Sequence, residues 1–149
     1  MVVTTLPALI PDIRKVYNSY FAAFKNERMG QMMLKVIFPN DDTDSDEFRN
    51  THAKGTLSWM HTCDYQYTWK AVDTTTGEIV GMALFDIHFK WRTEEERKNH
   101  GVPWLTGEAK ERAERVLNPL HDIREELFGG APHICKSSLC LSFPALVHI

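Results

Sequence analysis

The stretch from Tyr65 to Trp91 constrains the fold of this chain most, because it has the pattern of one long β-hairpin. Residues 67–72, YTWKAV, alternate between two unlike sets of side chains, which is the period of a strand with two different faces. A turn follows at 74–77, where Gly77 can adopt the positive φ that hairpin loops need. The pattern predicts a second strand from about Ile79 onward.

The second strand of this hairpin begins apolar on both faces and ends with one polar face. The even-numbered face changes from apolar to polar at Asp86 and continues through His88. A central strand that runs out into a polar cleft has this pattern, and an acid and an imidazole could share such a cleft. Asp86 and His88 are therefore the candidate catalytic residues. The alternative is that both side chains bond to loop backbone or reach solvent.

Length, charge and cysteine usage narrow the class of protein. A chain of 149 residues with 43% hydrophobic and 25% charged residues is typical of one globular domain. Its formal net charge of -3 offers no basic field for a nucleic-acid backbone. No apolar run approaches the roughly 20 residues of a membrane span, and we expect no signal peptide. Three cysteines without a dense framework favour a reducing compartment, so we expect a cytoplasmic protein that binds neither nucleic acid nor membranes.

Helical patterns precede the hairpin. Pro11 and Asp12 open a helix whose apolar residues recur at i, i+3, i+4 and i+7. A short second helix follows up to Pro39. Ser45 caps a third helix. The aromatic stripe of the first helix is typical of a core, and its end near Phe24, together with Met29, is a candidate pocket lining.

A short and a long helix are predicted after the hairpin. Thr93 and Glu96 form a capping box, and Thr106 caps a long helix that ends at Gly129. We expect Pro119 to kink the long helix. Its apolar positions predict a core-facing side made of Ala109, Ala113, Val116, Leu117, Leu120, Ile123 and Leu127.

The sequence gives little support for a metal-binding or a nucleophilic motif. The loop from Asn40 to Asp46 contains four aspartates but lacks the central glycine and bidentate glutamate of a calcium loop. No nucleophile elbow and no phosphate-cradling glycine loop occurs. We therefore expect no metal, although two histidines and two cysteines near the C-terminus loosely match zinc-ligand spacing: His133, Cys135, Cys140 and His148.

Four segments of the chain carry a resemblance to a known family. They are PALIPDIRKVYNSYFAAFKNERMGQMML, TGEIVGMALFDI, EEERKNHGVPWL and ERAERVLNPL. Together with the order of predicted strands and helices, they resemble the front half of the GNAT N-acetyltransferase superfamily, in particular a group of fungal GNAT-type acetyltransferases. The resemblance covers about Leu6 to Pro132.

The resemblance implies an α/β protein of the α+β kind with an incomplete GNAT-like fold. Its sheet would be mixed, with early strands at Val2–Leu6, Gln66–Asp73 and Glu78–Phe89. Residues 1–132 would form the GNAT-like N-terminal portion, including a helical insertion at about 92–128.

The resemblance also implies an activity and its ligands. Family members transfer an acetyl group from acetyl-CoA to the amine of a small molecule or peptide, while a base takes the amine proton. The first two helices border the acceptor site in the family. We expect Phe24, Met29 and Trp104 to bind the acceptor substrate.

The chain departs from the family after Pro132. In the family, the fourth strand leads into a Q/R-x-x-G-x-G/A loop, whose backbone N–H groups hold the CoA pyrophosphate at a helix N-terminus. No such loop occurs in the 149 residues, and HICKSSLCLSFPALVHI does not have the family's fourth-strand pattern. We expect residues 133–149 to be an atypical tail, which an altered reading frame or retained intron would explain. The strand edge beside Glu78–Phe89 would then lack a neighbour and could mediate self-association.

These patterns lead to one main functional expectation and two alternatives. The main expectation is a GNAT-like N-acetyltransferase family member with little or no acetyl transfer, because the acetyl-CoA cradle is missing. The first alternative is a non-catalytic interaction or small-ligand-binding module that uses the helix at 107–128 or the strand edge. The second is a hydrolase or metalloenzyme, supported by Asp86, His88 and the histidines and cysteines of the tail.

Overall fold

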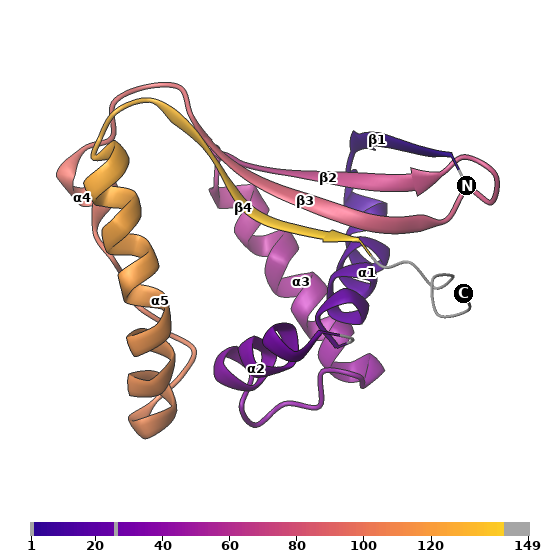
Figure 1. Cartoon of the computed structure of the whole chain (residues 1–149), viewed down its shortest axis with the longest axis horizontal. Coiled ribbons are helices and arrows are strands. Elements are labelled where there is room, and N and C mark those ends of the chain that lie inside the picture. Colours follow the sequence, from indigo (N-terminus) through magenta and orange to yellow (C-terminus); the bar gives the residue numbers. More distant parts are fainter. Residues whose placement is uncertain (1, 26, 142–149) are drawn as a thin grey trace.

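The computed structural model describes residues 2–25 and 27–141 and confirms an α+β fold (Figure 1). Four antiparallel strands form one sheet in the order β1-β2-β3-β4, so the sheet within the described residues is antiparallel, not mixed as the resemblance had implied. The strands are β1 (Val3–Pro7), β2 (Gln66–Asp73), β3 (Ile79–His88) and β4 (His133–Leu141). The helical elements are η1 (Ile10–Asp12), α1 (Ile13–Lys25), α2 (Arg28–Ile37), α3 (Asp46–Thr62), α4 (Glu94–Arg97) and α5 (Gly107–Phe128).

The hairpin predicted around residues 65–91 is confirmed. β2 and β3 pair antiparallel, with Gln66 opposite Asp86 and Ala71 opposite Gly81. The turn between them contains Gly77 at φ 75°, in the left-handed region that favours glycine. The hairpin therefore forms the centre of the sheet, with β1 on one side and β4 on the other.

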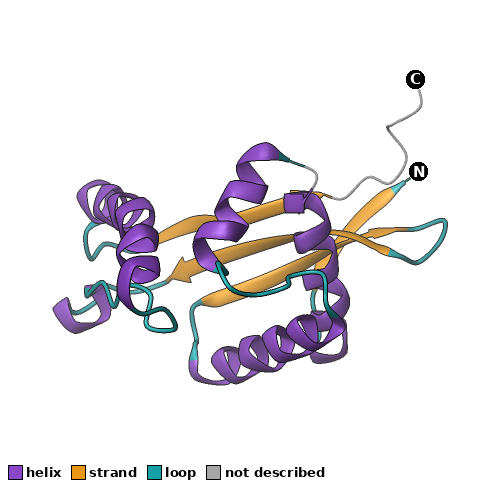
Figure 2. Ribbon diagram, turned by 90° about the horizontal axis from the view of Figure 1, so that it is seen from below, coloured by secondary structure: helices purple, strands orange, loops and turns teal. Residues whose placement is uncertain are grey.

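Helices α1, α2 and α3 lie on one face of the sheet (Figure 2). At the contact between α1 and β3, Val16 packs with Met82, and both side chains are buried. Lys70 of β2 reaches the same face and forms an ion pair with Asp12 at 2.7 Å. By strand alternation Trp69 projects from the opposite face, which no described helix covers. The core therefore lies on one side of the sheet.

An aromatic cluster joins the three helices of this layer. Phe21 of α1 is buried and makes edge contacts with Phe48 at 5.5 Å and His52 at 5.1 Å between ring centroids. Gly30 lets α2 approach the end of α1, because a Cβ at this position would collide with the Phe24 carbonyl. The predicted cap of α3 is confirmed, since the Ser45 side chain accepts a hydrogen bond from the third backbone N–H of the helix.

β4 lies beside β3, which corrects the expectation that this edge of the hairpin lacks a neighbour. Its register runs from Gly81 opposite Leu141 to His88 opposite His133. The backbone of β3 presents a row of N–H and C=O groups that need partners, and this demand outweighs the weak alternation of the β4 sequence. The free edges of the sheet, within the described residues, belong to β1 and β4.

The core-facing side predicted for α5 is wrong over the C-terminal half of the helix. Leu120, Ile123 and Leu127 are 60%, 52% and 69% exposed, whereas Ala113 and the preceding Val102 are buried. The reason is the position of α5, which stands at the end of the sheet, apart from α1 and α3 (Figure 1). Among the described helices, none has the length and hydropathy needed to cross a membrane.

Candidate functional site

The polar end of β3 borders a cavity of about 210 Å³. The cavity walls come from Asp64 and Tyr65 before β2, from residues 87–92 at the end of β3, and from Glu96 of α4. His88 and Arg92 belong to this wall. The place agrees with the cleft predicted from the hairpin pattern.

His88 belongs to a row of four stacked or tilted rings across this end of the sheet. The ring centroids of Tyr65 and His88 are 4.7 Å apart, and those of His88 and His133 are 4.9 Å apart. Phe128 at the end of α5 stacks on His133 at 4.6 Å. The row connects the segment before β2 with β3, β4 and α5, so it fixes the orientation of the His88 ring.

The surroundings set the protonation states of His88 and Tyr65. Burial is the main cause that lowers the pKa of His88, and the neighbouring Arg92 and His133 lower this pKa further. Burial, followed by the neighbouring Cys63, raises the pKa of Tyr65 to about 12. At neutral pH the cavity therefore contains an uncharged imidazole that can accept a hydrogen bond and a phenol that can donate one.

Asp86 lies on the same face as His88, but it is buried beneath the site. Its side chain is 10% exposed and is absent from the cavity wall. The amide of Gln66 donates to Asp86 Oδ1 at 3.1 Å, and Arg124 Nη1 lies 3.8 Å from Oδ2. Asp86 thus has side-chain partners in Gln66 and Arg124. Asp86 is therefore placed to hold the side chains of Gln66 and Arg124 in position.

A cluster of arginines surrounds Glu125 of α5 at the base of the site. Arg92 Nη2 lies 2.7 Å from Glu125 Oε1, and Arg97 Nε lies 2.8 Å from Oε2. Arg124 Nε lies 3.9 Å from Oε1. Burial alone would raise the pKa of Glu125, but hydrogen bonds from Arg97 and Arg92 outweigh it and hold this pKa below its ordinary value. The cluster fastens the C-terminal half of α5 to the end of β3.

Most of these partners are not indicated by any local pattern in the sequence. Arg92 continues the even-numbered face of Asp86 and His88, so the alternation could have indicated it. Arg124 and Glu125 come from the far end of α5, and no local pattern announces that this helix returns to β3. His133 was considered only as a zinc ligand.

The three residues expected to bind the acceptor lie away from the cavity. Phe24 is half-buried in the core, where it stacks on Tyr20 at 4.4 Å. Met29 is exposed on α2. Trp104 is also exposed, and its indole N–H donates to the Ile37 carbonyl at the end of α2. The structure brings Trp104 close to α2, but it brings none of the three to His88.

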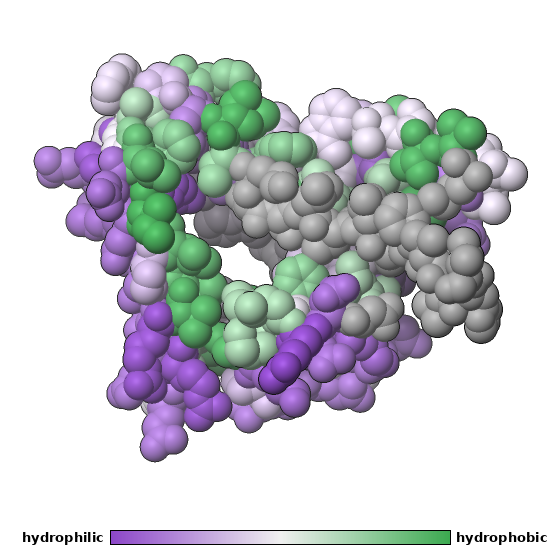
Figure 3. Space-filling model, viewed as in Figure 1, coloured by the Kyte–Doolittle hydropathy of each residue, from purple (hydrophilic) through white to green (hydrophobic). Residues whose placement is uncertain are grey.

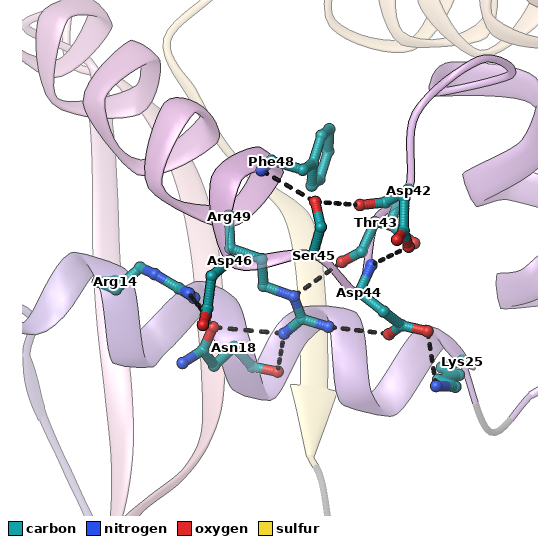
Figure 4. Close-up of polar contacts among 10 residues, drawn as sticks. All are labelled: Arg14, Asn18, Lys25, Asp42, Thr43, Asp44, Ser45, Asp46, Phe48 and Arg49. Carbon is teal, nitrogen blue, oxygen red and sulfur yellow. Dashed lines mark hydrogen bonds and ion pairs between the residues drawn. The ribbon is translucent and has the colours of Figure 1, made fainter.

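Two of the four aspartates in the 40–46 loop, Asp44 and Asp46, are paired with cations from α1 and α3 (Figure 4). Asp44 lies 2.7 Å from Lys25 Nζ and 3.3 Å from Arg49 Nη2. Asp46 lies 2.8 Å from Arg14 Nη2. These ion pairs connect the loop to the helix layer, and they use the carboxylates that a calcium ion would need.

The described part of the chain contains no candidate zinc site. No group of three or more histidine, cysteine or acidic side chains is arranged there to hold a metal ion. His133 and Cys135 lie in β4, and the ring of His133 packs in the ring row. Cys140 also belongs to β4, whereas His148 lies outside the described residues.

The described helix N-termini do not fit the pyrophosphate of acetyl-CoA. α3, α4 and α5 each carry acidic residues in the first turn, where a phosphate would need backbone N–H groups without competing negative charge. α2 begins after Glu27 as its N-cap, and α1 follows directly on Asp12 of η1. At these helix starts a pyrophosphate would therefore meet competing negative charge.

No protein-family model matches the chain, and a search of curated proteins gives no match. The likeness to GNAT acetyltransferases thus depends on the segments quoted above and enters the functional argument as a proposal.

Proposed function

We propose that the chain is a GNAT-like protein that contains the acceptor side of an N-acetyltransferase and binds an amine beside His88. The order of elements supports this proposal. Three helices between the first two strands, a central hairpin and a helical insertion are what the resemblance implies for the front half of the family. A small-molecule amine or an amine on a peptide are the two acceptor classes in the family.

The observation that carries the proposal is the position of the His88 ring in the cavity wall, where it stacks on Tyr65. The amine needs a hydrogen-bond acceptor. A side chain that acts as a base on the amine must be unprotonated before the amine reacts. The lowered pKa of His88 supplies this state at neutral pH. The ring row holds the imidazole in place, so little side-chain entropy is lost when the amine binds.

We further propose that these 149 residues carry out little or no acetyl transfer by themselves. The helix N-termini described above offer no place for the CoA pyrophosphate. Each missing charge-assisted hydrogen bond removes roughly 1.5–3 kcal/mol of binding free energy. Acetyl-CoA binding in the micromolar range is therefore not expected.

The test uses n-butylamine as the acceptor probe. We expect the amine to shift the His88 imidazole signals in NMR spectra and to lower the pKa of this ring further. Calorimetric binding of the amine should be lost in His88→Gln and persist in His61→Gln, a control at an exposed histidine of α3. Absence of any amine effect on His88 would contradict acceptor binding, and micromolar calorimetric binding of acetyl-CoA would contradict the loss of transfer.

A second candidate function is a protein-interaction module, favoured by the exposed apolar side of α5. Apolar residues follow this helix on the surface (Figure 3), and Leu120, Ile123 and Leu127 are each more than half exposed. Light scattering after size-exclusion chromatography tests this candidate, because a stable monomer would argue against self-association through α5 or through a strand edge.

A further inference from the structure

Helix α5 carries an apolar stripe with the spacing of a two-helix seam. Its members follow one another at alternating intervals of three and four residues: Ala113, Val116, Leu120, Ile123 and Leu127. This spacing is the a/d repeat that lets the side chains of two helices interlock along their length. Ala113 at the start of the stripe is buried, but the last three members are each more than half exposed. In Figure 3 the apolar surface follows the helix on the face turned to the viewer.

The two flanks of this stripe differ in what they contact. On the inner flank, which faces the rest of the protein, the side chains of Glu114, His121 and Arg124 are at most 27% exposed. The residues of the outer flank are all exposed: Arg112, Arg115, Pro119, Asp122 and Glu126. The side of α5 between the stripe and the outer flank is therefore open to a second helix.

The charges of the outer flank favour an antiparallel copy of the same helix. Arg112 and Arg115 come first along α5, whereas Asp122 and Glu126 come last. A parallel copy would place like charges side by side, but an antiparallel copy brings the basic half beside the acidic half. We propose that α5 pairs antiparallel with α5 of a second copy of this chain, which gives a two-fold symmetric dimer. This inference rests on the second candidate function above, to which it adds the partner.

The apolar stripe selects the register of the pair. Leu120 packs beside Ile123 of the second copy, which places Val116 level with Leu127 of that copy. By the two-fold symmetry, each of these residues has an apolar neighbour from the other chain. A shift of the helices by one residue would place stripe residues against charged ones.

This register also places the charges of the outer flank. Arg115 lies two residues, or about 3 Å along the axis, from the level of Glu126 of the second copy. The two symmetric copies of this pair contribute attraction at both ends of the seam. Glu108, on the same flank, falls beyond the end of the partner helix. Asp122 lies near the two-fold axis and faces its own copy, which opposes pairing.

The length of the seam sets the strength of the dimer. The segment from Val116 to Leu127 is about 18 Å long, so the pair lies at or below the low end of the roughly 1,200–2,000 Å² of stable interfaces. We therefore expect a transient dimer that predominates at about 200 μM protein and dissociates at about 2 μM, the range used for unfolding measurements.

Sedimentation velocity of the full chain between about 2 and 200 μM tests the seam. Leu120→Asp should weaken the dimer at least about tenfold, because it places a charge in the middle of the apolar stripe. Val2→Asp is the matched control, since Val2 is 67% exposed and Leu120 is 60% exposed, and it should leave the dimer unchanged. Circular dichroism of each variant checks that the helix content is retained.

Charge reversal tests the antiparallel direction at low salt. Arg115→Glu should weaken the dimer about fivefold, because it faces Glu126 of the second copy with a like charge. The double variant Arg115→Glu with Glu126→Arg should restore the dimer, which a parallel pair would not allow. Asp122→Asn should strengthen it about twofold, because it removes repulsion near the axis. Lys54→Glu on the exposed side of α3 is the control and should have no effect.

The other outcomes separate failure of this inference from failure of the candidate function. A dimer that survives Leu120→Asp would overturn the seam and leave self-association through another surface. A dimer that Leu120→Asp disrupts but the double charge reversal does not restore would overturn the antiparallel direction. A monomer at every concentration would contradict both the pair and self-association itself.

Discussion

Helices α1 and α5 are both amphipathic, but only α1 has its apolar side covered along its length. Phe21 in the middle of α1 is buried, whereas Leu127 in the last turn of α5 is 69% exposed. A helical pattern therefore identifies an apolar side without specifying what covers it. Covering depends on the neighbours that the topology supplies.

The two regions are also held by different forces. The α1–α3 layer is joined by packed rings and by the Arg49 guanidinium, which lies 5.0 Å from the centre of the Phe21 ring. The end of α5 is attached mainly through Glu125 and its arginines. We therefore expect substitutions of apolar residues to act mostly on the first region and substitutions of charged residues mostly on the second.

The largest expected effect comes from removing an apolar side chain in the covered region. Phe21→Ala should lower the free energy of unfolding by about 3–5 kcal/mol, because it leaves a cavity among the rings. Leu127→Ala should lower it by less than about 0.5 kcal/mol, because the side chain is already exposed. Urea unfolding followed by circular dichroism measures both. A loss above about 2 kcal/mol in Leu127→Ala would show that the α5 side is covered in solution.

The next effect comes from the charged attachment of α5. Glu125→Gln should destabilise the protein by about 2–3 kcal/mol, because it leaves buried Arg92 without its carboxylate partner. The neighbouring Glu126 is exposed, and Glu126→Gln should change stability by less than about 0.5 kcal/mol. Equal stability of the two variants in urea would contradict an electrostatic attachment.

A smaller effect distinguishes the N-terminal caps of α3 and α5. The Ser45 hydroxyl accepts a hydrogen bond from the Phe48 N–H at 3.1 Å, so Ser45→Ala should cost about 1 kcal/mol. Thr106 occupies the same position before α5 but makes no such side-chain bond, so Thr106→Ala should cost less than about 0.5 kcal/mol. Thermal unfolding of both variants checks this difference. A larger loss of stability in Thr106→Ala than in Ser45→Ala would contradict it.

The smallest effect at neutral pH concerns His52 in the ring cluster. Burial lowers the pKa of His52 below its unfolded value of about 6.5. The unfolded chain therefore binds more protons than the folded one just below that pH, so stability falls as the pH decreases from about 6.5. His52→Phe should leave stability at pH 7 nearly unchanged and reduce its loss between pH 6.5 and 5. An unchanged slope in urea titrations across this range would contradict the burial of a neutral His52.

The parts of the fold that could be predicted are those encoded by neighbouring residues. The hairpin follows from alternation and Gly77, and the start of α3 follows from Ser45. The capping box of Thr93 and Glu96 is present as predicted. In each case the stabilising contact lies within a few positions of the residue that signals it.

The parts that could not be predicted depend on contacts between distant segments. β4 is a strand because β3 offers it a partner, although its own alternation is weak. The site was found only through Asp86 and His88, since Arg124 and Glu125 reach it from the end of a helix whose direction no local pattern reveals. The exposure of Leu127 likewise depends on where α5 lies in space.

We expect the pairing of β3 with β4 to set the order in which parts of the molecule unfold. These adjacent strands are separated in the chain by all of residues 89–132, so their pairing closes a long loop and holds α5 in place. The β2–β3 hairpin, by contrast, is closed by a short turn. Amide hydrogen exchange should therefore proceed through a partly open form in which β4 and α5 detach as one cooperative unit while the hairpin and α1 remain protected.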